Sequence, residues 1–330
     1  MTTLAVLPSP ATPLSHESAR AAFADILDGR AADDEIAGFL ADLSDRGETS
    51  IEIAEAARAL RERLLPIIAP PGTIDVCGTG GDGHHTLNVS TAVALVVAAA
   101  GVPVAKHGNR AASSKAGAAD TLEALGLDMT RAGAAAEDTL HALGICFLFA
   151  GNHHPAMKRI TPIRRRLGRR TIFNLMGPLA NPARVTRQLI GIARPDYAPV
   201  YAEALELLGT EAALIVSGDE GLDELSSAGA SVAVGIGCID LPERIAPEDA
   251  GLPRHPLERI RGGDPAHNAL ALRRLLSGVT GAYRDAVLLN AAAALVLAGT
   301  TTDLKGGVAQ AAAALDSGAA NNLLDRWIAW

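Results

Sequence analysis

Aromatic residues are scarce in this sequence of 330 residues: two Trp, three Tyr and five Phe make up 3% of the chain. So few rings argue against a surface that stacks the bases of single-stranded nucleic acid. The chain also lacks an excess of positive charge: it has 29 Lys and Arg and 37 Asp and Glu, which gives a net charge of -8. Surfaces that bind nucleic acid are usually basic, so we expect no nucleic-acid partner.

Cysteine and long apolar segments are also rare. Cys77, Cys146 and Cys238 are odd in number and lie far apart, which argues against a disulfide framework or a metal site and fits a reducing cytosol. The apolar stretch at 89–105 contains polar residues and a proline, and the stretch at 286–299 is too short to span a bilayer. Since the first residues also lack a signal-peptide pattern, we predict a cytoplasmic protein without a membrane segment.

Small side chains are abundant, with 65 Ala and 33 Gly. They let backbones approach one another closely, and a hydrophobic content of 48% is enough to form a core. At roughly 150 residues per domain, the length corresponds to about two domains.

The first seventy residues have the apolar spacing of helices. Apolar residues recur every three or four positions within 19–27 and 36–43. Thr49 and Glu52 form a capping-box pattern before a third helix. Prolines at 66, 70 and 71 then break the chain, so we predict a helical domain at 1–70.

Beyond residue 70, short β-prone segments alternate with alanine-rich helical segments, until a basic segment at 154–187 interrupts them. This alternation is typical of an α/β fold in which helices flank a central sheet. We predict strands at 73–76, 102–105, 145–149, 189–193 and 214–217, and helices at 91–100, 121–125, 134–143 and 197–208.

A glycine-rich loop, Gly78-Thr79-Gly80-Gly81-Asp82-Gly83, follows the first predicted strand. Its backbone N–H groups can bind an anion at the start of the next helix. A tight strand-to-helix turn is the alternative interpretation. The helix start carries more small polar residues than capping needs, namely Thr86, Asn88, Ser90 and Thr91.

A second polar segment, Lys106-His107-Gly108-Asn109-Arg110, follows the next predicted strand. Ligands of open α/β sheets bind at the carboxyl ends of strands, so this repetition favours an anion site over a solvated loop. Asp223 and Glu224 are candidates for Mg²⁺, which prefers one or two carboxylates together with substrate phosphates and water. The sequence alone does not show that these two acids face the glycine loop.

The remaining chemical groups have simpler interpretations. Most of the seven basic residues between positions 158 and 170 are expected on a solvated helix face. The functional alternatives are a nucleic-acid patch or an arginine that binds a substrate carboxylate. The pairs His84-His85 and His153-His154 favour loop packing or polar contacts over a metal, because adjacent side chains diverge. Cys77 lacks an activating partner and is expected to be a buried side chain. The basic cluster consists of Lys158, Arg159, Arg164, Arg165, Arg166, Arg169 and Arg170.

Taken together, these motifs resemble those of the anthranilate phosphoribosyltransferases. The resemblance rests on 78–82, 88–91 and 106–114, and it continues through 154–157, 177–182 and 221–226 to 311–320, which looks like the family's final helix. It covers nearly the whole chain, and the motifs are specific in combination.

The resemblance implies an enzyme of tryptophan biosynthesis. Such an enzyme transfers the phosphoribosyl group of phosphoribosyl pyrophosphate (PRPP) to the amine of anthranilate and releases pyrophosphate. It also implies a homodimer joined through the helical domain and an active site at the hinge. Residues 161–187 would rejoin the helical domain, while 71–160 and 188–330 would form the α/β domain that binds PRPP.

The resemblance further implies the site residues. Arg164, Gly78 and Asn109 would contact anthranilate, with Arg164 pairing its carboxylate. Mg²⁺ would be bound by Ser90, Asp223 and Glu224. No catalytic residue is assigned, because the neutral aromatic amine already has an available lone pair. PRPP would be bound by Gly78, Gly81, Asp82, Thr86, Asn88, Val89, Ser90, Thr91, Lys106, His107, Gly108, Asn109, Arg110, Ala111, Ala112, Ser113, Ser114 and Ala118.

Four positions depart from the family's pattern. Val89 replaces a more usual isoleucine, Ala118 lacks a hydroxyl and leaves only a backbone contact, and Ser217 and Glu220 stand where His and Asp are more common. None of these changes removes a charge that the mechanism requires.

Two other functions are weighed against this one. A pyrimidine nucleoside phosphorylase shares the fold and cleaves the same type of bond, but the intact 106–114 segment and Arg164 argue against it. A nucleic-acid-binding relative without transferase activity is opposed by the acidic balance and by the retained Asp223-Glu224 pair.

Overall fold

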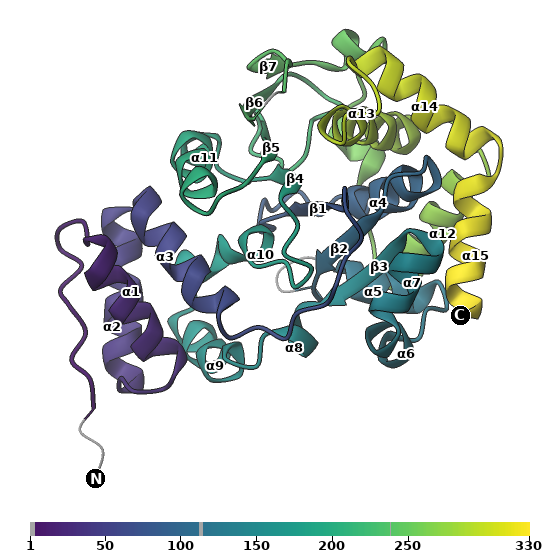
Figure 1. Ribbon diagram of the computed structural model, residues 1–330. Coiled ribbons are helices and arrows are strands. Elements are labelled where there is room, and N and C mark those ends of the chain that lie inside the picture. The colour runs from purple at the N-terminus through teal and green to yellow at the C-terminus, as the bar shows by residue number, and fades with distance from the viewer. Residues whose placement is uncertain (1–3, 112–114, 238) are drawn as a thin grey trace.

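The computed structural model describes residues 4–111, 115–237 and 239–330. Ala112, Ser113, Ser114 and Cys238 therefore lie outside the described residues. Within the described ranges, no helix is both long and apolar enough to cross a membrane. The first three helices lie on one side of a central sheet, and the last helices lie on the opposite side (Figure 1).

One mixed sheet runs through the described residues in the strand order β3-β2-β1-β4-β5-β6-β7. Strands β1 to β5 pair in parallel, whereas β6 and β7 are antiparallel. All five predicted strands are confirmed with small shifts of their ends, and β6 and β7 were not predicted. The strands are β1 (Ile74–Gly78), β2 (Val104–Gly108), β3 (Ile145–Phe149), β4 (Arg187–Gly191), β5 (Ala212–Gly218), β6 (Ser231–Ile236) and β7 (Arg244–Ile245).

Helices cover both faces of this sheet. Helices α4 and α13 pack on one face, and α10 and α11 pack on the other. The α-helices that follow β1 are α4 (Val89–Ala99), α5 (Ala118–Ala124), α6 (Met129–Ala134), α7 (Ala136–Leu143), α8 (Ala150–His153), α9 (Met157–Leu167), α10 (Met176–Leu179), α11 (Ala198–Leu207), α12 (Pro265–Leu276), α13 (Ala282–Leu297), α14 (Leu304–Asp316) and α15 (Ala319–Ala329). Short 3₁₀ turns are η1 (Ile172–Asn174), η2 (Pro195–Tyr197), η3 (Pro247–Ala250) and η4 (Leu257–Ile260).

The segment that resembles a single final helix at 311–320 is in fact divided between two helices. Helix α14 ends at Asp316, and α15 begins at Ala319. Gly318 between them has φ 76°, a left-handed conformation that glycine adopts without strain. The expectation of one helix there was wrong, because the chain bends at this glycine between α14 and α15.

The N-terminal helices α1 (His16–Leu27), α2 (Asp33–Arg46) and α3 (Ser50–Arg61) form a bundle that α9 joins. The predicted capping box starts α3: Thr49 Oγ1 accepts from the Glu52 backbone N–H at 3.3 Å, and the Glu52 carboxylate accepts from the Thr49 N–H at 2.8 Å. Phe173, after α9, lies edge-on to Phe23 of α1 at 6.4 Å between ring centroids. The basic segment that interrupts the α/β alternation thus packs against the bundle.

The sheet has a separate apolar core on each face. Leu189, Leu214 and Val216 join the core with α4 and α13, whereas Ile190 and Ile215 join the core shared with the bundle and α11. This division follows from the alternation of side chains along a strand. The bundle and the sheet are therefore joined through one continuous core rather than through a polar interface.

The strand order reverses direction at β1. Strand β2 lies on one side of β1 and β4 lies on the other, so the connections leaving these neighbouring strands diverge. In open α/β sheets, ligands bind in the crevice outside the carboxyl ends of the strands at such a point. The fold therefore predicts a ligand site at the segments that follow Gly78 and Gly108.

Candidate active site

A cavity of about 400 Å³ opens at the carboxyl ends of β1 and β2. Its walls are the glycine loop after β1, the start of α4, the end of β2, the acidic loop after β5, and residues of α9 and α10 on the bundle side. Its size lies within the range of small-molecule sites. Most of the predicted site residues that the structure describes line this one cavity.

Glycine allows the glycine loop and the acidic loop to meet. A Cβ on Gly78 would lie 2.3 Å from Asp223 Oδ2, and a Cβ on Gly191 would lie 1.6 Å from the Asp223 carbonyl oxygen. Gly80 has φ 70° and donates its N–H to Asp223 Oδ2 at 2.7 Å. The structure therefore brings Asp223 directly against the glycine loop, which the sequence alone did not show.

Asp223, Glu224 and Asp82 place three carboxyl groups at one wall of the cavity. Burial, and then the nearby Asp82 carboxyl group, raises the pKa of Asp223 to about 7. Burial, and then Asp223, raises the pKa of Glu224 well above its usual value, although Lys106 opposes this rise. No three His, Cys, Asp or Glu side chains among the described residues are grouped so that they could hold a metal ion. Mg²⁺ at this wall would therefore need substrate phosphates and water as further ligands.

Lys106 is a buried cation that interacts electrostatically with Glu224 of this wall. Its side chain extends from β2 and is only 3% exposed. The ammonium donates to the Val76 carbonyl oxygen at 2.8 Å and to Ser90 Oγ at 3.2 Å. An ammonium has three donors, so these two bonds fix its position and leave one donor for an anion in the cavity.

The start of α4 contributes Thr86, Asn88, Val89 and Ser90 to the cavity lining. Asn88 occupies the N-cap position without capping the helix through its side chain. Its Oδ1 instead accepts from Thr121 Oγ1 at 2.5 Å and from Asn268 Nδ2 at 2.9 Å. The Asn88 side chain therefore serves contacts other than capping.

Thr91 is the one predicted residue of this segment that does not line the cavity. Its side chain is 2% exposed, and its hydroxyl has no partner among the described residues. It lies one helical position beyond Ser90, on a face turned into the core. Its assignment to PRPP stays a prediction that the geometry does not favour.

The segment after β2 brings His107, Gly108, Asn109, Arg110 and Ala111 to the cavity, together with Ala118 at the start of α5. Arg110 is less available than the sequence indicates, because Asp120 and Glu123 already pair with its guanidinium at 2.9 and 2.6 Å. Asp120 also accepts from the backbone N–H groups of Ala111 and Gly117, both at 2.9 Å.

His107 and His154 form a buried pair beside the cavity, with 3.2 Å between their Nε2 atoms. His107 Nδ1 lies 2.7 Å from the Gly177 carbonyl oxygen, which makes Nδ1 the donor. Burial lowers the pKa of His107 to about 3 and that of His154 to about 4. Both rings are therefore neutral near pH 7.

His153 and His84 likewise contact backbone carbonyl oxygens, at 2.8 and 3.1 Å.

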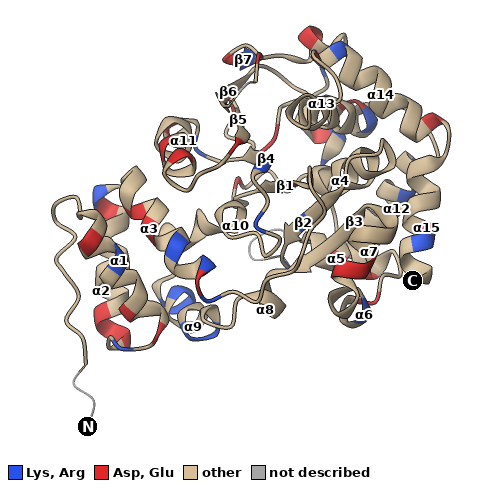
Figure 2. Ribbon diagram, viewed as in Figure 1, with Lys and Arg blue, Asp and Glu red and all other residues tan. Residues whose placement is uncertain are grey.

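Arg164 of α9 faces the cavity from the bundle side. It is half-buried, its Nε has no partner among the described residues, and burial lowers the pKa of its guanidinium. Its neighbours on the same segment differ, because Arg159 and Arg166 pair with Asp33 and Asp34 of α2, both at 2.9 Å. Figure 2 shows the basic residues of α9 beside the acidic ones of α2.

Several cavity residues were not predicted from the sequence. Phe173, Asn174 and Gly177 line it from the segment between α9 and α10, and Ala150 lines it from α8. Gly177 belongs to a motif quoted for the resemblance, which was the available signal. Cys77 lines the cavity as well, with a thiol pKa that burial raises, and this agrees with its expected lack of reactivity.

Comparison with known proteins identifies the class to which this fold and site belong. Residues 11–64 match the family described as "Glycosyl transferase family, helical bundle domain", and residues 70–321 match "Glycosyl transferase family, a/b domain". An anthranilate phosphoribosyltransferase from Sphingopyxis alaskensis is 66% identical over 324 residues, which are 98% of each chain.

Solved structures give the same result. Anthranilate phosphoribosyltransferase from Thermus thermophilus superposes with a TM-score of 0.89 at 46% identity, covering 97% of this chain and 96% of that one. The Saccharomyces cerevisiae enzyme in complex with PRPP and Mg superposes with a TM-score of 0.87 at 29% identity, covering 96% and 93%. The chain belongs to this glycosyl transferase family and, within it, to the anthranilate phosphoribosyltransferases.

Proposed function

We propose that the cavity at the ends of β1 and β2 is where the phosphoribosyl group of PRPP is transferred to the amine of anthranilate. The products are N-(5-phosphoribosyl)anthranilate and pyrophosphate, in tryptophan biosynthesis. The observation that carries this assignment is the position of Arg164, a half-buried cation with an unpartnered Nε, on the wall opposite the glycine loop and the carboxylates. One wall suits a substrate carboxylate, and the other suits phosphates and a metal.

PRPP would lie along the glycine loop and the segment after β2. The free N–H groups of the loop and the remaining donor of Lys106 would bind the pyrophosphate oxygens. These donors already have fixed positions, since Lys106 is bonded to Val76 and Ser90. Fixed donors stabilise negative charge as it develops on the leaving group, without a cost of reorganisation. Asn88, Gly108 and Asn109 complete this wall.

Mg²⁺ is the cofactor, and Asp223, Glu224 and Ser90 would hold it. The fit rests on the close carboxyl groups of Asp82, Asp223 and Glu224, whose mutual repulsion a divalent cation would relieve. When bound, Mg²⁺ neutralises charge on the pyrophosphate group.

Anthranilate would bind with its carboxylate on Arg164 and its ring near Gly78 and Asn109, residues that it would share with PRPP. A charge-assisted contact of this kind is stronger than a neutral hydrogen bond. The neutral histidine pair beside Gly177 adds no competing cation there. Since the amine is neutral, it needs only to be held near the anomeric carbon, so no general base is assigned.

The test is an assay with PRPP, Mg²⁺ and anthranilate, in which anthranilate fluorescence and pyrophosphate are followed together. We expect fluorescence loss and pyrophosphate release in equal amounts. Pyrophosphate release that does not depend on anthranilate, or an absence of both signals, would contradict the proposal.

We also propose that residues 1–70 and 161–187 form the helical domain, that 71–160 and 188–330 form the PRPP-binding domain, and that two copies associate through the helical domain. Support for the division comes from Ile163 and Phe173, which share a core with the bundle. Leu4 and Val6, 55% and 87% exposed, leave apolar surface at the bundle. Light scattering coupled to gel filtration would detect the dimer.

The free thiols of Cys77 and Cys146 support the proposed cytoplasmic location, which cell fractionation would test.

A further inference from the structure

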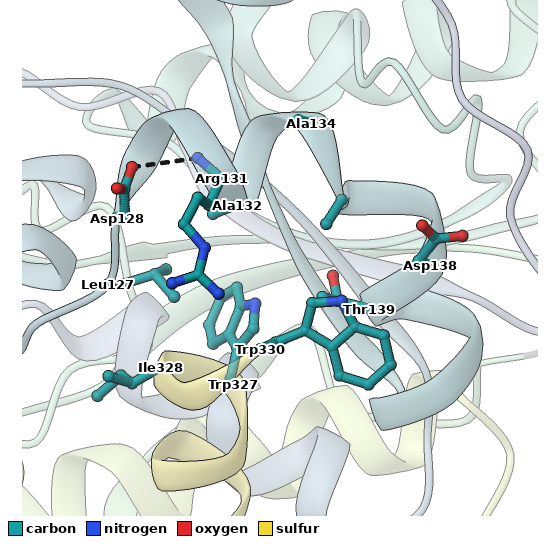
Figure 3. A pocket seen from close by; sticks show the side chains of 11 residues that line it. Leu127, Asp128, Arg131, Ala132, Ala134, Asp138, Thr139, Trp327, Ile328 and Trp330 are labelled. Atoms are coloured by element: carbon teal, nitrogen blue, oxygen red, sulfur yellow. Dashed lines mark hydrogen bonds between the residues drawn. The ribbon is translucent and has the colours of Figure 1, made fainter.

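A second cavity, of about 290 Å³, lies between α6, α7 and the end of α15. It shares no lining residue with the active-site cavity. The sequence has only two Trp residues, and both of them, Trp327 and Trp330, line this pocket. A chain that is otherwise poor in rings thus places both indoles at one site (Figure 3).

The walls of this pocket combine apolar and polar side chains. Leu127, Ala132 and Ile328 line it together with the two indoles. Trp330 is 47% exposed, so part of its indole is open to a ligand. Flat aromatic surfaces of this kind favour stacked or edge-to-face contacts with another ring. The pocket volume suits a ligand of one or two rings.

The polar lining combines the carboxyl groups of Asp128 and Asp138 with two donors that lack a protein partner among the described residues. Trp327 is 3% exposed, and its Nε1–H has no acceptor among the described residues. The Arg131 guanidinium has no hydrogen-bond or ion-pair partner in the described part of the chain. Figure 3 shows Arg131 reaching toward the indole side chains. Helix α7 begins at the pocket after Ala135, which gives it no side-chain cap.

The acidic groups do not satisfy these donors. Asp128 accepts from the backbone N–H groups of Thr130 and Arg131 at 2.8 and 3.1 Å, so it serves as the N-cap of α6. Asp138 is exposed and has no partner among the described residues. Its negative charge disfavours a ligand with more than one negative charge.

We propose that this pocket binds an aromatic monocarboxylate of one or two rings. The ring lies against Trp327 and Trp330, and the carboxylate accepts from Arg131. The site is independent of the transfer reaction, because no residue of the catalytic cavity contributes to it.

The two indoles supply the readout for a test with the whole enzyme. Excited at the red edge of the indole band, the intrinsic fluorescence reports on this pocket alone. The probe is 3-phenylpropanoate, with 3-phenylpropanamide and 3-phenylpropylamine as neutral and cationic matches. We expect a saturable fluorescence change with the carboxylate, and binding of the amide and the amine at least about tenfold weaker.

Two variants assign the contact. Arg131→Gln replaces an exposed residue and should raise the Kd for 3-phenylpropanoate about tenfold, while Arg326→Gln, on α15 outside the pocket, should leave it unchanged. Arg164→Ala should also leave it unchanged, which separates this pocket from the anthranilate site. Absence of a saturable change, equal binding of acid and amide, or an unaltered Kd in Arg131→Gln would overturn the proposal. So would loss of the response in Arg164→Ala.

Discussion

The face shared by α2 and α9 and the active-site cavity contain the same kinds of charged residues in opposite situations. On the α2–α9 face, Arg159 and Arg166 pair with Asp33 and Asp34 in exposed positions. In the cavity, Arg164 lacks a partner for its Nε, and Asp223 and Glu224 lie beside further acid. Charges that satisfy one another contribute to structure, whereas charges left unsatisfied are available for a ligand.

The difference arises from geometry within a single helix. Arg164 and Arg166 are two positions apart on α9, and side chains at this spacing point to different sides of a helix. One side faces α2 and the other faces the sheet. Sequence composition cannot separate these roles, because both sides of the helix carry arginine.

The largest effect is expected from removing the acidic wall. Asp223→Asn combined with Glu224→Gln should lower kcat by about 100- to 1000-fold at limiting Mg²⁺, because metal charge stabilisation is worth several kcal/mol. Steady-state kinetics across a Mg²⁺ titration would measure this. A variant whose metal dependence matched the wild type would remove these residues from the metal site.

Arg164→Ala should raise the KM for anthranilate by about 10- to 100-fold, the range for a lost hydrogen bond to a charged group. The KM for PRPP should change little, because PRPP is assigned to the opposite wall. Initial-rate kinetics with each substrate varied in turn would show the split. Equal increases in both values would contradict the placement of anthranilate at Arg164.

The histidine pair tests how a buried site tolerates charge. The folded-state pKa values of His107 and His154 lie below the usual value, so the unfolded chain binds protons more readily below about pH 6.5. The free energy of unfolding should therefore fall as pH drops from about 6.5 to about 4, at about 1.4 kcal/mol per pH unit for each histidine. Urea denaturation at several pH values would measure this slope.

His154→Gln provides the control for that slope. The variant keeps a polar side chain but removes one titrating group, so its stability should depend less steeply on pH over the same interval. An identical slope in the variant would mean that other groups cause the acid sensitivity.

The smallest effect is expected on the α2–α9 face. Arg166→Gln breaks an exposed pair with Asp34, and exposed pairs contribute little to stability. The denaturation midpoint and both KM values should stay at wild-type levels. A rise in the KM for anthranilate as large as that of Arg164→Ala would erase the distinction between the two regions.

The main features of the fold could be predicted from the sequence because they depend on local patterns. The capping box at Thr49 and the five parallel strands follow from residue type and spacing. Strands β6 and β7 were missed, since small residues and glycine weaken the β pattern of 231–236 and β7 has only two residues. These strands are defined by pairing with β5, a contact between distant segments.

The site could be predicted less completely. The glycine loop and the segment after β2 lie at strand ends, where the sequence already indicates a ligand. Asp223 can approach Gly80 because positions 78 and 191 have no side chain. This contact joins segments far apart in the sequence, so no local pattern predicts it. The pairing of Arg110 with Asp120 and Glu123, and the burial of Thr91, likewise depend on tertiary packing.

The two-residue strand β7 has a consequence for how copies of this protein can associate. An exposed sheet edge offers free backbone groups to which a strand of another molecule can add. Strand β7 has only two residues, so it offers few free backbone groups to another strand. Arg244, which pairs with Asp219, also places a charged side chain on this edge. Growth of the sheet from one molecule into the next is therefore blocked at this edge, which protects a glycine- and alanine-rich protein from aggregation.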